Sequence, residues 1–291
     1  MNVLALSHSN GIAARISKYL DIPLIRAQRK KFPDGEIYVR IPQALDDTTI
    51  IVQSLEYPQS ENFIELLECI EAARGLNTQR IITIIPYLAY ARQDKRFLEG
   101  EPITVKIILK TLESLGVDAL ITVDIHQERS LKEWLSIPAR NVLPYKEIAS
   151  YFKNKLESPL VLAPDKGALK RAKLVAEQLN TDFDYNEKKR DRITGEVTVL
   201  PRKINVENRD IIIVDDIIST GGTITLATKS ALENGANRVY VACTHALLIN
   251  GALDRIFSAG ATEVVATDTV KSPISKISVA PTLANALKEF I

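Results

Sequence analysis

The chain has 291 residues, 46% of them hydrophobic, which is enough to bury one large core or two of ordinary size. Its 37 basic and 36 acidic residues give a net charge of +1, so no global basic field favours nucleic acid as a partner. The cysteines Cys69 and Cys243 lie in apolar stretches, which argues against a disulfide framework or a thiolate metal site. The amino terminus lacks the basic flank of a signal peptide and no apolar run is long enough to span a membrane. We therefore expect a soluble, cytoplasmic protein with no membrane partner.

The first half of the chain alternates helical patterns with short branched runs. Phe32–Glu36, with the sequence Phe-Pro-Asp-Gly-Glu, is typical of a tight turn that opens a strand. Helical patterns over 61–74 and 103–115 are followed by branched runs at 80–85 and 119–123. Apolar strands that alternate with helices indicate a parallel sheet covered on both faces.

Two polar segments of this half are candidates for ligand binding. Arg92–Arg96 places three cations in five residues, which suits a polyanion such as a triphosphate, although a solvated charge cluster is an equally good explanation. Asp124 and His126 follow the strand at 119–123, so we expect both side chains to project to the same side, where open α/β sheets bind ligands. A hydrogen-bonded core histidine explains His126 equally well.

A domain boundary is expected near Val142–Phe152, after which the alternation resumes. Ala163–Gly167 is an acid-plus-glycine turn before a helical pattern at 170–179, and it could hold a diphosphate with magnesium or be an ordinary turn. The charged segment Glu187–Arg192 indicates an exposed loop or hairpin, and as an isolated segment a solvated turn is favoured.

The most informative segment is Val214–Thr223, with the sequence Val-Asp-Asp-Ile-Ile-Ser-Thr-Gly-Gly-Thr. The branched run Ile211–Val214 predicts a buried strand that two adjacent carboxylates end, and a helical pattern follows over 223–234. A glycine-rich turn from a strand into a helix presents backbone N–H groups to a phosphate. Carboxylates beside that phosphate suit sugar hydroxyls, so the pattern predicts a sugar-phosphate site.

The two halves repeat one another loosely. Five sequence matches keep their order at offsets of 144 to 162 residues, as expected of a duplicated domain with altered loops. In this repeat Gln53-Ser54 corresponds to Asp215-Asp216, and the first half has no Ser-Thr-Gly-Gly-Thr run. The sugar-phosphate site is therefore expected in the second domain only.

Taken together, these segments resemble ribose-phosphate diphosphokinases, the synthases of 5-phosphoribosyl 1-diphosphate (PRPP), over nearly the whole chain. The segments that carry the resemblance are Phe32–Glu36, Arg92–Lys95, Gly100–Thr104, Asp124–Gln127, Ala163–Asp165, Lys188–Arg190, Val214–Thr223 and Ser278–Ala284. The resemblance implies an α/β fold of two tandem phosphoribosyltransferase-like domains, each with a mostly parallel sheet flanked by helices. The domains would be residues 1–145, on the ATP side, and 146–291, with the last helix able to pack back on the first domain.

The resemblance also implies the reaction: Mg²⁺-dependent transfer of the β,γ-diphosphoryl group of ATP to the anomeric hydroxyl of ribose 5-phosphate. The residues implied to bind ribose 5-phosphate are Arg190, Asp215, Asp216, Ser219, Thr220, Gly221, Gly222 and Thr223. Those implied to bind ATP are Phe32, Asp34, Gly35, Glu36, Arg92, Gln93, Asp94, Lys95 and His126. His126 and Asp165 would place the metal, and Lys188 and Arg190 would be catalytic. The adenine site would be shared between subunits of a homo-oligomer.

One departure from the family pattern is Ser219, where many relatives carry aspartate; because serine still donates to a phosphate, we expect binding to survive. Two other classes remain open: a phosphoribosyltransferase that consumes PRPP, and a non-catalytic regulatory subunit associated with the synthase. The first needs no ATP site, and the second tolerates disrupted catalytic loops. Arg92–Arg96 argues against the first, and the intact Val214–Thr223 segment argues against the second.

Overall fold

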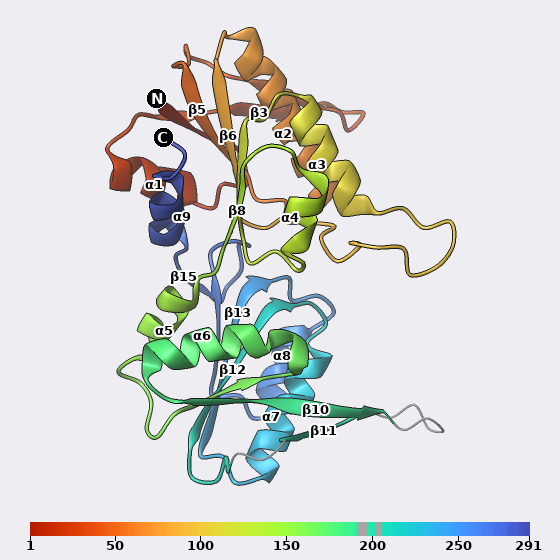
Figure 1. The fold of residues 1–291 in the computed structure, drawn as a ribbon, viewed down its shortest axis with the longest axis vertical. Coiled ribbons are helices and arrows are strands. Elements are labelled where there is room, and N and C mark those ends of the chain that lie inside the picture. The colour runs from red at the N-terminus through yellow and green to blue at the C-terminus, as the bar shows by residue number, and fades with distance from the viewer. Residues whose placement is uncertain (191–196, 202–204) are drawn as a thin grey trace. The chain divides into compact units, whose positions relative to one another are not determined.

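The computed structural model describes residues 1–190, 197–201 and 205–291, with side chains described outside 187–204. The chain forms two compact units (Figure 1). The first unit contains Met1–Leu143, Thr269–Lys271 and Ser278–Ile291, and the second contains Pro144–Asp268 and Ser272–Ile277.

The first unit is a parallel six-stranded sheet in the order β2-β1-β5-β6-β7-β8 with a separate antiparallel hairpin, β3–β4. Its strands are β1 (Asn2–Ala5), β2 (Leu24–Arg26), β3 (Gln28–Lys31), β4 (Ile37–Arg40), β5 (Thr48–Val52), β6 (Arg80–Ile85), β7 (Ala119–Val123) and β8 (Ala139–Val142). Its helices are α1 (Ile12–Leu20), α2 (Gln59–Gly75), α3 (Thr104–Ser114), α4 (Arg129–Trp134) and α9 (Ala280–Leu287).

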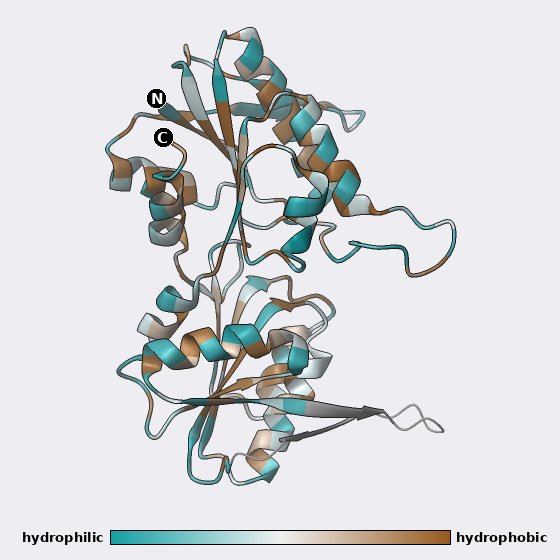
Figure 2. Cartoon of the chain, viewed as in Figure 1, coloured by the Kyte–Doolittle hydropathy of each residue, from teal (hydrophilic) through white to brown (hydrophobic). Residues whose placement is uncertain are grey.

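The sheet of the first unit is covered on both faces (Figure 1). On one face, alternate strand residues such as Val3, Ile50 and Ile121 pack with α1 and with Leu283 of the last helix. Helices α2 and α3 cover the other face with buried leucines and isoleucines. Figure 2 shows the strands as largely hydrophobic and the helices as mixed, as expected when each helix turns one side to a sheet.

The second unit is a seven-stranded sheet in the order β11-β10-β9-β12-β13-β14-β15, in which only the β10–β11 pair is antiparallel. Its strands are β9 (Leu160–Ala163), β10 (Asp182–Arg190), β11 (Val197–Pro201), β12 (Asp210–Ile218), β13 (Arg238–Ala246), β14 (Glu263–Thr267) and β15 (Ser275–Ile277). Its helices are α5 (Tyr145–Phe152), the short 3₁₀ helix η1 (Lys166–Ala168), α6 (Leu169–Leu179), α7 (Gly222–Glu233) and α8 (Ala252–Ser258).

Two clusters form the core of the second unit, one on each face of the sheet. Phe152 of α5 and Val175 of α6 pack with Val161 and Val214 on one face. Ile224 of α7 and Ile256 of α8 pack with alternate strand residues on the other. The α/β class, with mostly parallel sheets flanked by helices, is confirmed.

The order of strands in the two sheets matches element by element. In each, the first strand of the unit (β1 or β9) pairs on one side with the next strand along the chain (β2 or β10), which leads into an antiparallel hairpin, and four strands follow on the other side. The hairpins β3–β4 and β10–β11 occupy equivalent places in this order. The repeat that five short sequence matches indicate is therefore also present in the strand order of the two sheets. Among the described residues, no helix is long and apolar enough to cross a membrane.

Candidate active site

The acids of the Val214–Thr223 segment lie at the carboxyl edge of the second sheet. Strand β12 pairs with β9 only as far as Ile213, but it stays paired with β13 to Ile218. The expectation that Asp215 and Asp216 end the strand is thus wrong, because pairing with the longer β13 keeps the backbone extended beyond them. Since β9 stops earlier, both acids still lie beyond the pairing on that side.

Asp216 is held by a cation that the sequence alone did not single out. Its carboxylate is buried and lies 3.3 Å from a guanidinium nitrogen of Arg171, on α6. Its other oxygen accepts a hydrogen bond of 2.9 Å from the backbone N–H of Ile217. These contacts fix the carboxylate in one orientation at the edge where ligands bind in open α/β sheets.

The carboxylate of Asp215 has less compensation for its burial than that of Asp216. Burial raises the pKa of its carboxyl well above the ordinary value, the neighbouring Asp216 raises it further, and Arg171 opposes the shift. Asp215 accepts a hydrogen bond of 3.0 Å from the backbone N–H of Asp216. An acceptor with so little compensation is suited to the hydroxyl groups of a ligand.

The turn after β12 is held through its backbone carbonyl groups. The carbonyls of Ile218 and Ser219 accept hydrogen bonds from the loop after β13, that of Gly221 accepts from Thr225 of α7, and Arg255 of α8 donates to the carbonyl of Thr220. The cap residue of α7, Gly221, has no side chain to occupy the first-turn N–H groups. These groups can therefore bind a phosphate at the positive end of the helix dipole.

Gly221 itself cannot be replaced without strain, because its φ is +76°. A Cβ atom at this position would lie 3.2 Å from both Ala252 and Ile256 on α8. We expect Gly221→Ala to cost about 1–2 kcal/mol of unfolding free energy from the left-handed backbone alone. Chemical denaturation measures this cost, and Gly222→Ala, where the added Cβ meets nothing within 4 Å, is the control that we expect to be milder.

Asp165 lies at the carboxyl end of the adjacent strand β9. Its side chain caps η1 by accepting a hydrogen bond of 2.9 Å from the N–H of Gly167. Because Leu162 pairs with Ile213, continuing that register brings Asp165 level with Asp216. The second unit thus gathers three carboxylates at one edge of its sheet, two on β12 and one after β9.

The segment that carries Lys188 and Arg190 is a hairpin, which decides between the loop and the hairpin that the sequence left open. Lys188 pairs with Val199 and Arg190 with Val197 in an antiparallel register. The side chains of both cations and residues 191–196 lie outside the described part of the structure. Their catalytic role stays a prediction.

Phe32–Glu36 forms the turn of the β3–β4 hairpin in the first unit. The N–H of Phe32 donates to the carbonyl of Glu36 over 2.8 Å, and Asp34 accepts from the N–H of Glu36 over 3.1 Å. Gly35 supplies the positive φ of 101° that this turn requires. All five residues are exposed, so the turn presents an aromatic ring and two carboxylates to a ligand.

The Arg92–Lys95 segment follows β6 and is organised by Glu101. One oxygen of Glu101 accepts hydrogen bonds from the backbone N–H groups of Phe97 and Leu98, at 2.7 and 3.1 Å, and lies 3.3 Å from the side-chain nitrogen of Gln93. Arg92 and Lys95 remain exposed. Asp94 differs from them, because its buried carboxylate pairs with Arg129 at 3.0 Å and anchors the segment.

The expectation that Asp124 and His126 project to the same side is wrong. Strand β7 ends at Val123, and Asp124 adopts a left-handed backbone with φ 43°, so the two-residue alternation of a strand does not continue. Asp124 is buried and His126 is exposed. The exposure of His126 argues against the core-histidine explanation, and its place after β7 keeps it at the carboxyl edge of the first sheet.

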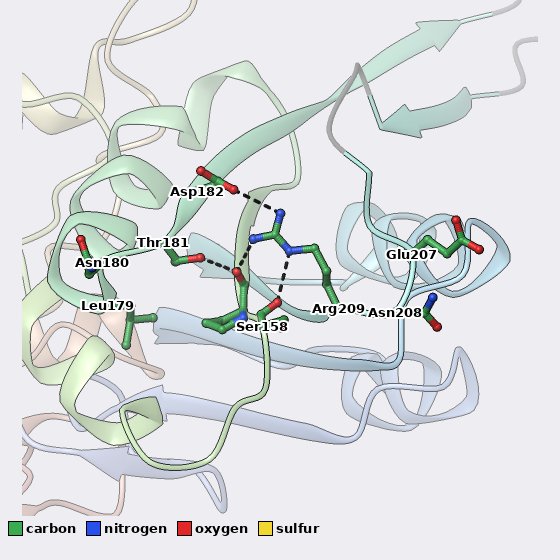
Figure 3. A pocket seen from close by; sticks show the side chains of 9 residues that line it. Ser158, Leu179, Asn180, Thr181, Asp182, Glu207, Asn208 and Arg209 are labelled. Atoms are coloured by element: carbon green, nitrogen blue, oxygen red, sulfur yellow. Dashed lines mark hydrogen bonds and ion pairs between the residues drawn. The ribbon is translucent and has the colours of Figure 1, made fainter.

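A hollow at the other end of the second sheet is not a candidate active site. Figure 3 shows Arg209 there, with its guanidinium bonded to Asp182 and to the carbonyls of Ser158 and Pro159. These residues precede the amino ends of β9, β10 and β12. Because Arg209 already ties these loops together and ligands of open α/β sheets bind at the carboxyl ends, we interpret the hollow as structural.

Sequence reasoning missed two arginines of the site. Arg171 fixes Asp216, and Arg255 fixes the Thr220 carbonyl. One of the five matches of the repeat pairs Gly11–Arg15 with Gly167–Arg171, which marked the position of Arg171 but gave no reason to connect it with an acid on β12. Arg255 carried no sequence signal.

Comparison with known proteins identifies the family. The family model described as the N-terminal domain of ribose phosphate pyrophosphokinase matches residues 1–116, and the phosphoribosyl transferase domain model matches residues 139–257. The ribose-phosphate pyrophosphokinase of Sulfurisphaera tokodaii is 43% identical over 282 residues, covering 96% of each chain. That of Methanopyrus kandleri is 40% identical over 291 residues, covering 99% of each. The chain belongs to the ribose-phosphate pyrophosphokinase family.

Structural comparison agrees with this membership. The crystal structure of phosphoribosylpyrophosphate synthetase from Mycobacterium smegmatis matches with a TM-score of 0.86 at 28% identity, covering 99% of this chain and 98% of that one. The predicted fold of two phosphoribosyltransferase-like domains is confirmed by this match and by the two domain models.

Proposed function

We propose that this pyrophosphokinase transfers the diphosphoryl group of ATP to ribose 5-phosphate, giving AMP and PRPP. The anomeric hydroxyl oxygen forms a bond to the β-phosphorus, the bond from that phosphorus to the α-phosphate oxygen breaks, and AMP leaves. The observation that carries the proposal is the edge of the second sheet, where a glycine-rich helix start adjoins Asp215 and Asp216. Full-length similarity to curated ribose-phosphate pyrophosphokinases supports it.

We assign the binding roles by unit. In the second domain, residues 146–291, the turn Ser219–Thr223 would hold the 5-phosphate, and Asp215 and Asp216 the ribose hydroxyls. In the first domain, residues 1–145, the Phe32–Glu36 turn would hold adenine, and the Arg92–Lys95 segment together with His126 the rest of ATP. Lys188 and Arg190 would act on the migrating group. Since both substrates are metabolites of the cytoplasm, we place the enzyme there.

The donor set fits magnesium as a partner of the substrate. Among the described residues no three histidine, cysteine or carboxylate side chains converge as a metal cage. Mg²⁺ in phosphoryl-transfer sites commonly uses one or two carboxylates and completes its shell with phosphate oxygens and water. Asp165, at the sugar-phosphate edge, and the exposed His126 would supply protein contacts. Bound Mg²⁺ would neutralise charge on the transferred group.

The decisive assay uses the purified chain with ATP, Mg²⁺ and ribose 5-phosphate, and measures AMP and PRPP. We expect both products in equal amounts and none when ribose 5-phosphate is omitted. A chain that instead consumes PRPP with a nucleobase is a phosphoribosyltransferase. A chain that makes no product but changes the rate of an active synthase is the regulatory alternative.

We predict that the active protein self-associates. The exposed Phe32–Glu36 turn would complete the adenine site of a neighbouring subunit. In a monomer its aromatic ring and acids would have no adenine to bind. Light scattering at the assay concentration measures the state. An active monomer would remove this prediction and leave the reaction assignment intact.

A further inference from the structure

The two hairpins carry equivalent cations. Val3 pairs with Leu24 and Ile50, as Val161 pairs with Phe183 and Ile212, so the two sheets can be superimposed residue by residue. In this superposition Leu24 corresponds to Phe183. Arg29 and Lys188 each lie five residues further along the chain, and Lys31 and Arg190 each lie seven residues further, so they are counterparts. The hairpin registers agree independently, because Lys31 is the last paired residue of β3 and Arg190 is the last paired residue of β10.

The same superposition shows what replaces the three acids in the first unit. Asp165, Asp215 and Asp216 correspond to Ser7, Gln53 and Ser54, all neutral. The place is filled instead by Glu65 from α2, whose side chain is fully buried. Its oxygens accept hydrogen bonds from the N–H of Ser7 at 2.9 Å, from the Ser7 hydroxyl, and from the Gln53 side chain at 3.1 Å. A protein carboxylate thus occupies the first unit's counterpart of the sugar-phosphate edge.

Arg29 and Lys31, the two counterpart cations of the first unit, are neutralised by α2. Arg29 lies 3.3 Å from Glu65 and 3.0 Å from Glu61, and Lys31 lies 2.7 Å from Glu61. The hydrogen bond from Lys31 is the largest of the causes that lower the pKa of Glu61. Strand β4 also lies against α2. The hairpin that ends in the adenine turn is therefore tied to a helix of its own unit.

The counterpart of α2 in the second unit lacks these acids. Helix α7, the counterpart of α2, has the sequence Gly-Thr-Ile-Thr-Leu-Ala-Thr-Lys-Ser-Ala-Leu-Glu, with no acid before its last residue, Glu233. No carboxylate of α7 therefore stands at the counterparts of Glu61 and Glu65.

We propose that Glu61 and Glu65 act as built-in substitutes for a bound anion, tying down the β3–β4 hairpin so that its Phe32–Glu36 turn is positioned for adenine before ATP arrives. The β3–β4 hairpin thus serves as a fixed platform in the first unit. Glu61 and Glu65 are positioning residues in this proposal, which rests on the proposed function for its link to ATP.

The test compares three isosteric variants on one helix: Glu61→Gln, Glu65→Gln and, as the matched control, Glu71→Gln, an exposed acid of α2 away from these hairpin contacts. Hydrogen–deuterium exchange of the peptide spanning 28–40 reports on the hairpin without any turnover. We expect its amides to exchange about threefold faster in Glu61→Gln and on the order of tenfold faster in Glu65→Gln, with no change in Glu71→Gln. Unchanged exchange in both test variants overturns the proposal.

Steady-state kinetics then connects the hairpin to ATP. We expect the KM for ATP to rise by about threefold in Glu61→Gln and about tenfold in Glu65→Gln, while the KM for ribose 5-phosphate stays within about twofold. Equal changes in both constants would mean a general loss of structure and contradict the positioning role. Should Glu65→Gln fail to fold, Glu61→Gln and Lys31→Gln still decide the question, because both positions are partly exposed. A wild-type chain without synthase activity refutes the proposed function, whereas the exchange measurement still decides whether the hairpin is tied.

Discussion

We expect Lys188→Ala to lower kcat by about a thousandfold with little change in either KM. The physical reason is that diphosphoryl transfer depends on positioning and charge stabilisation more than on covalent chemistry by the protein. Lys188 is the cation that we propose acts on the group that moves. Contacts made only as charge develops in the transition state lower the barrier and leave ground-state binding unchanged.

The neighbouring lysine provides the control. Lys188 pairs with Val199 and Lys189 with Thr198, and adjacent positions of a strand lie on opposite faces. We expect Lys189→Ala to keep kcat within about twofold of the wild type, as is usual for surface changes. Equal loss of turnover in both variants, or loss in neither, would show that Lys188 is not catalytic.

The sequence predicted the fold well because its signals are local. Branched runs such as 80–85 and 119–123 are strands with the predicted bounds, and the strand–glycine–helix frame of Val214–Thr223 is present. The repeat predicted two similar units because duplicated strands keep their apolar pattern while loops drift. These features depend on residues close together in the chain.

What the sequence could not show depends on contacts between distant residues or on local backbone breaks. Arg171 reaches Asp216 across 45 residues, and Glu65 reaches Ser7 across 58. No periodicity identifies such pairs, because each partner looks like an ordinary helix or loop residue by itself. Asp124 shows the other limit: its left-handed φ reversed an expectation that assumed an unbroken strand.

The other large effect is expected for Asp215→Asn, which should weaken sugar use and stabilise the empty fold. Losing a charged acceptor for a ribose hydroxyl costs about 1.5–3 kcal/mol, so the KM for ribose 5-phosphate should rise by roughly tenfold to a hundredfold, with the KM for ATP nearly unchanged. Steady-state kinetics with each substrate varied measures this split. Wild-type kinetics for the sugar would show that the site is misplaced.

The stabilising part of this prediction follows from the sign of the pKa shift. Because burial and Asp216 raise the pKa of Asp215 in the folded state, the folded chain binds this proton more tightly than the unfolded chain does. The stabilisation that the proton provides is complete at pH values below the pKa that Asp215 has in the unfolded chain. It is lost as pH rises through the higher pKa that Asp215 has in the folded chain. At neutral pH the charged side chain therefore destabilises the fold, and asparagine removes that charge while keeping an oxygen for the N–H of Asp216.

We expect Asp215→Asn to raise the melting temperature at pH 7 and to lose this advantage toward pH 4. A variant with a lower melting temperature at pH 7 would contradict a raised pKa of Asp215. A variant that is more stable but uses ribose 5-phosphate poorly would show that the carboxylate is retained for binding at the expense of stability.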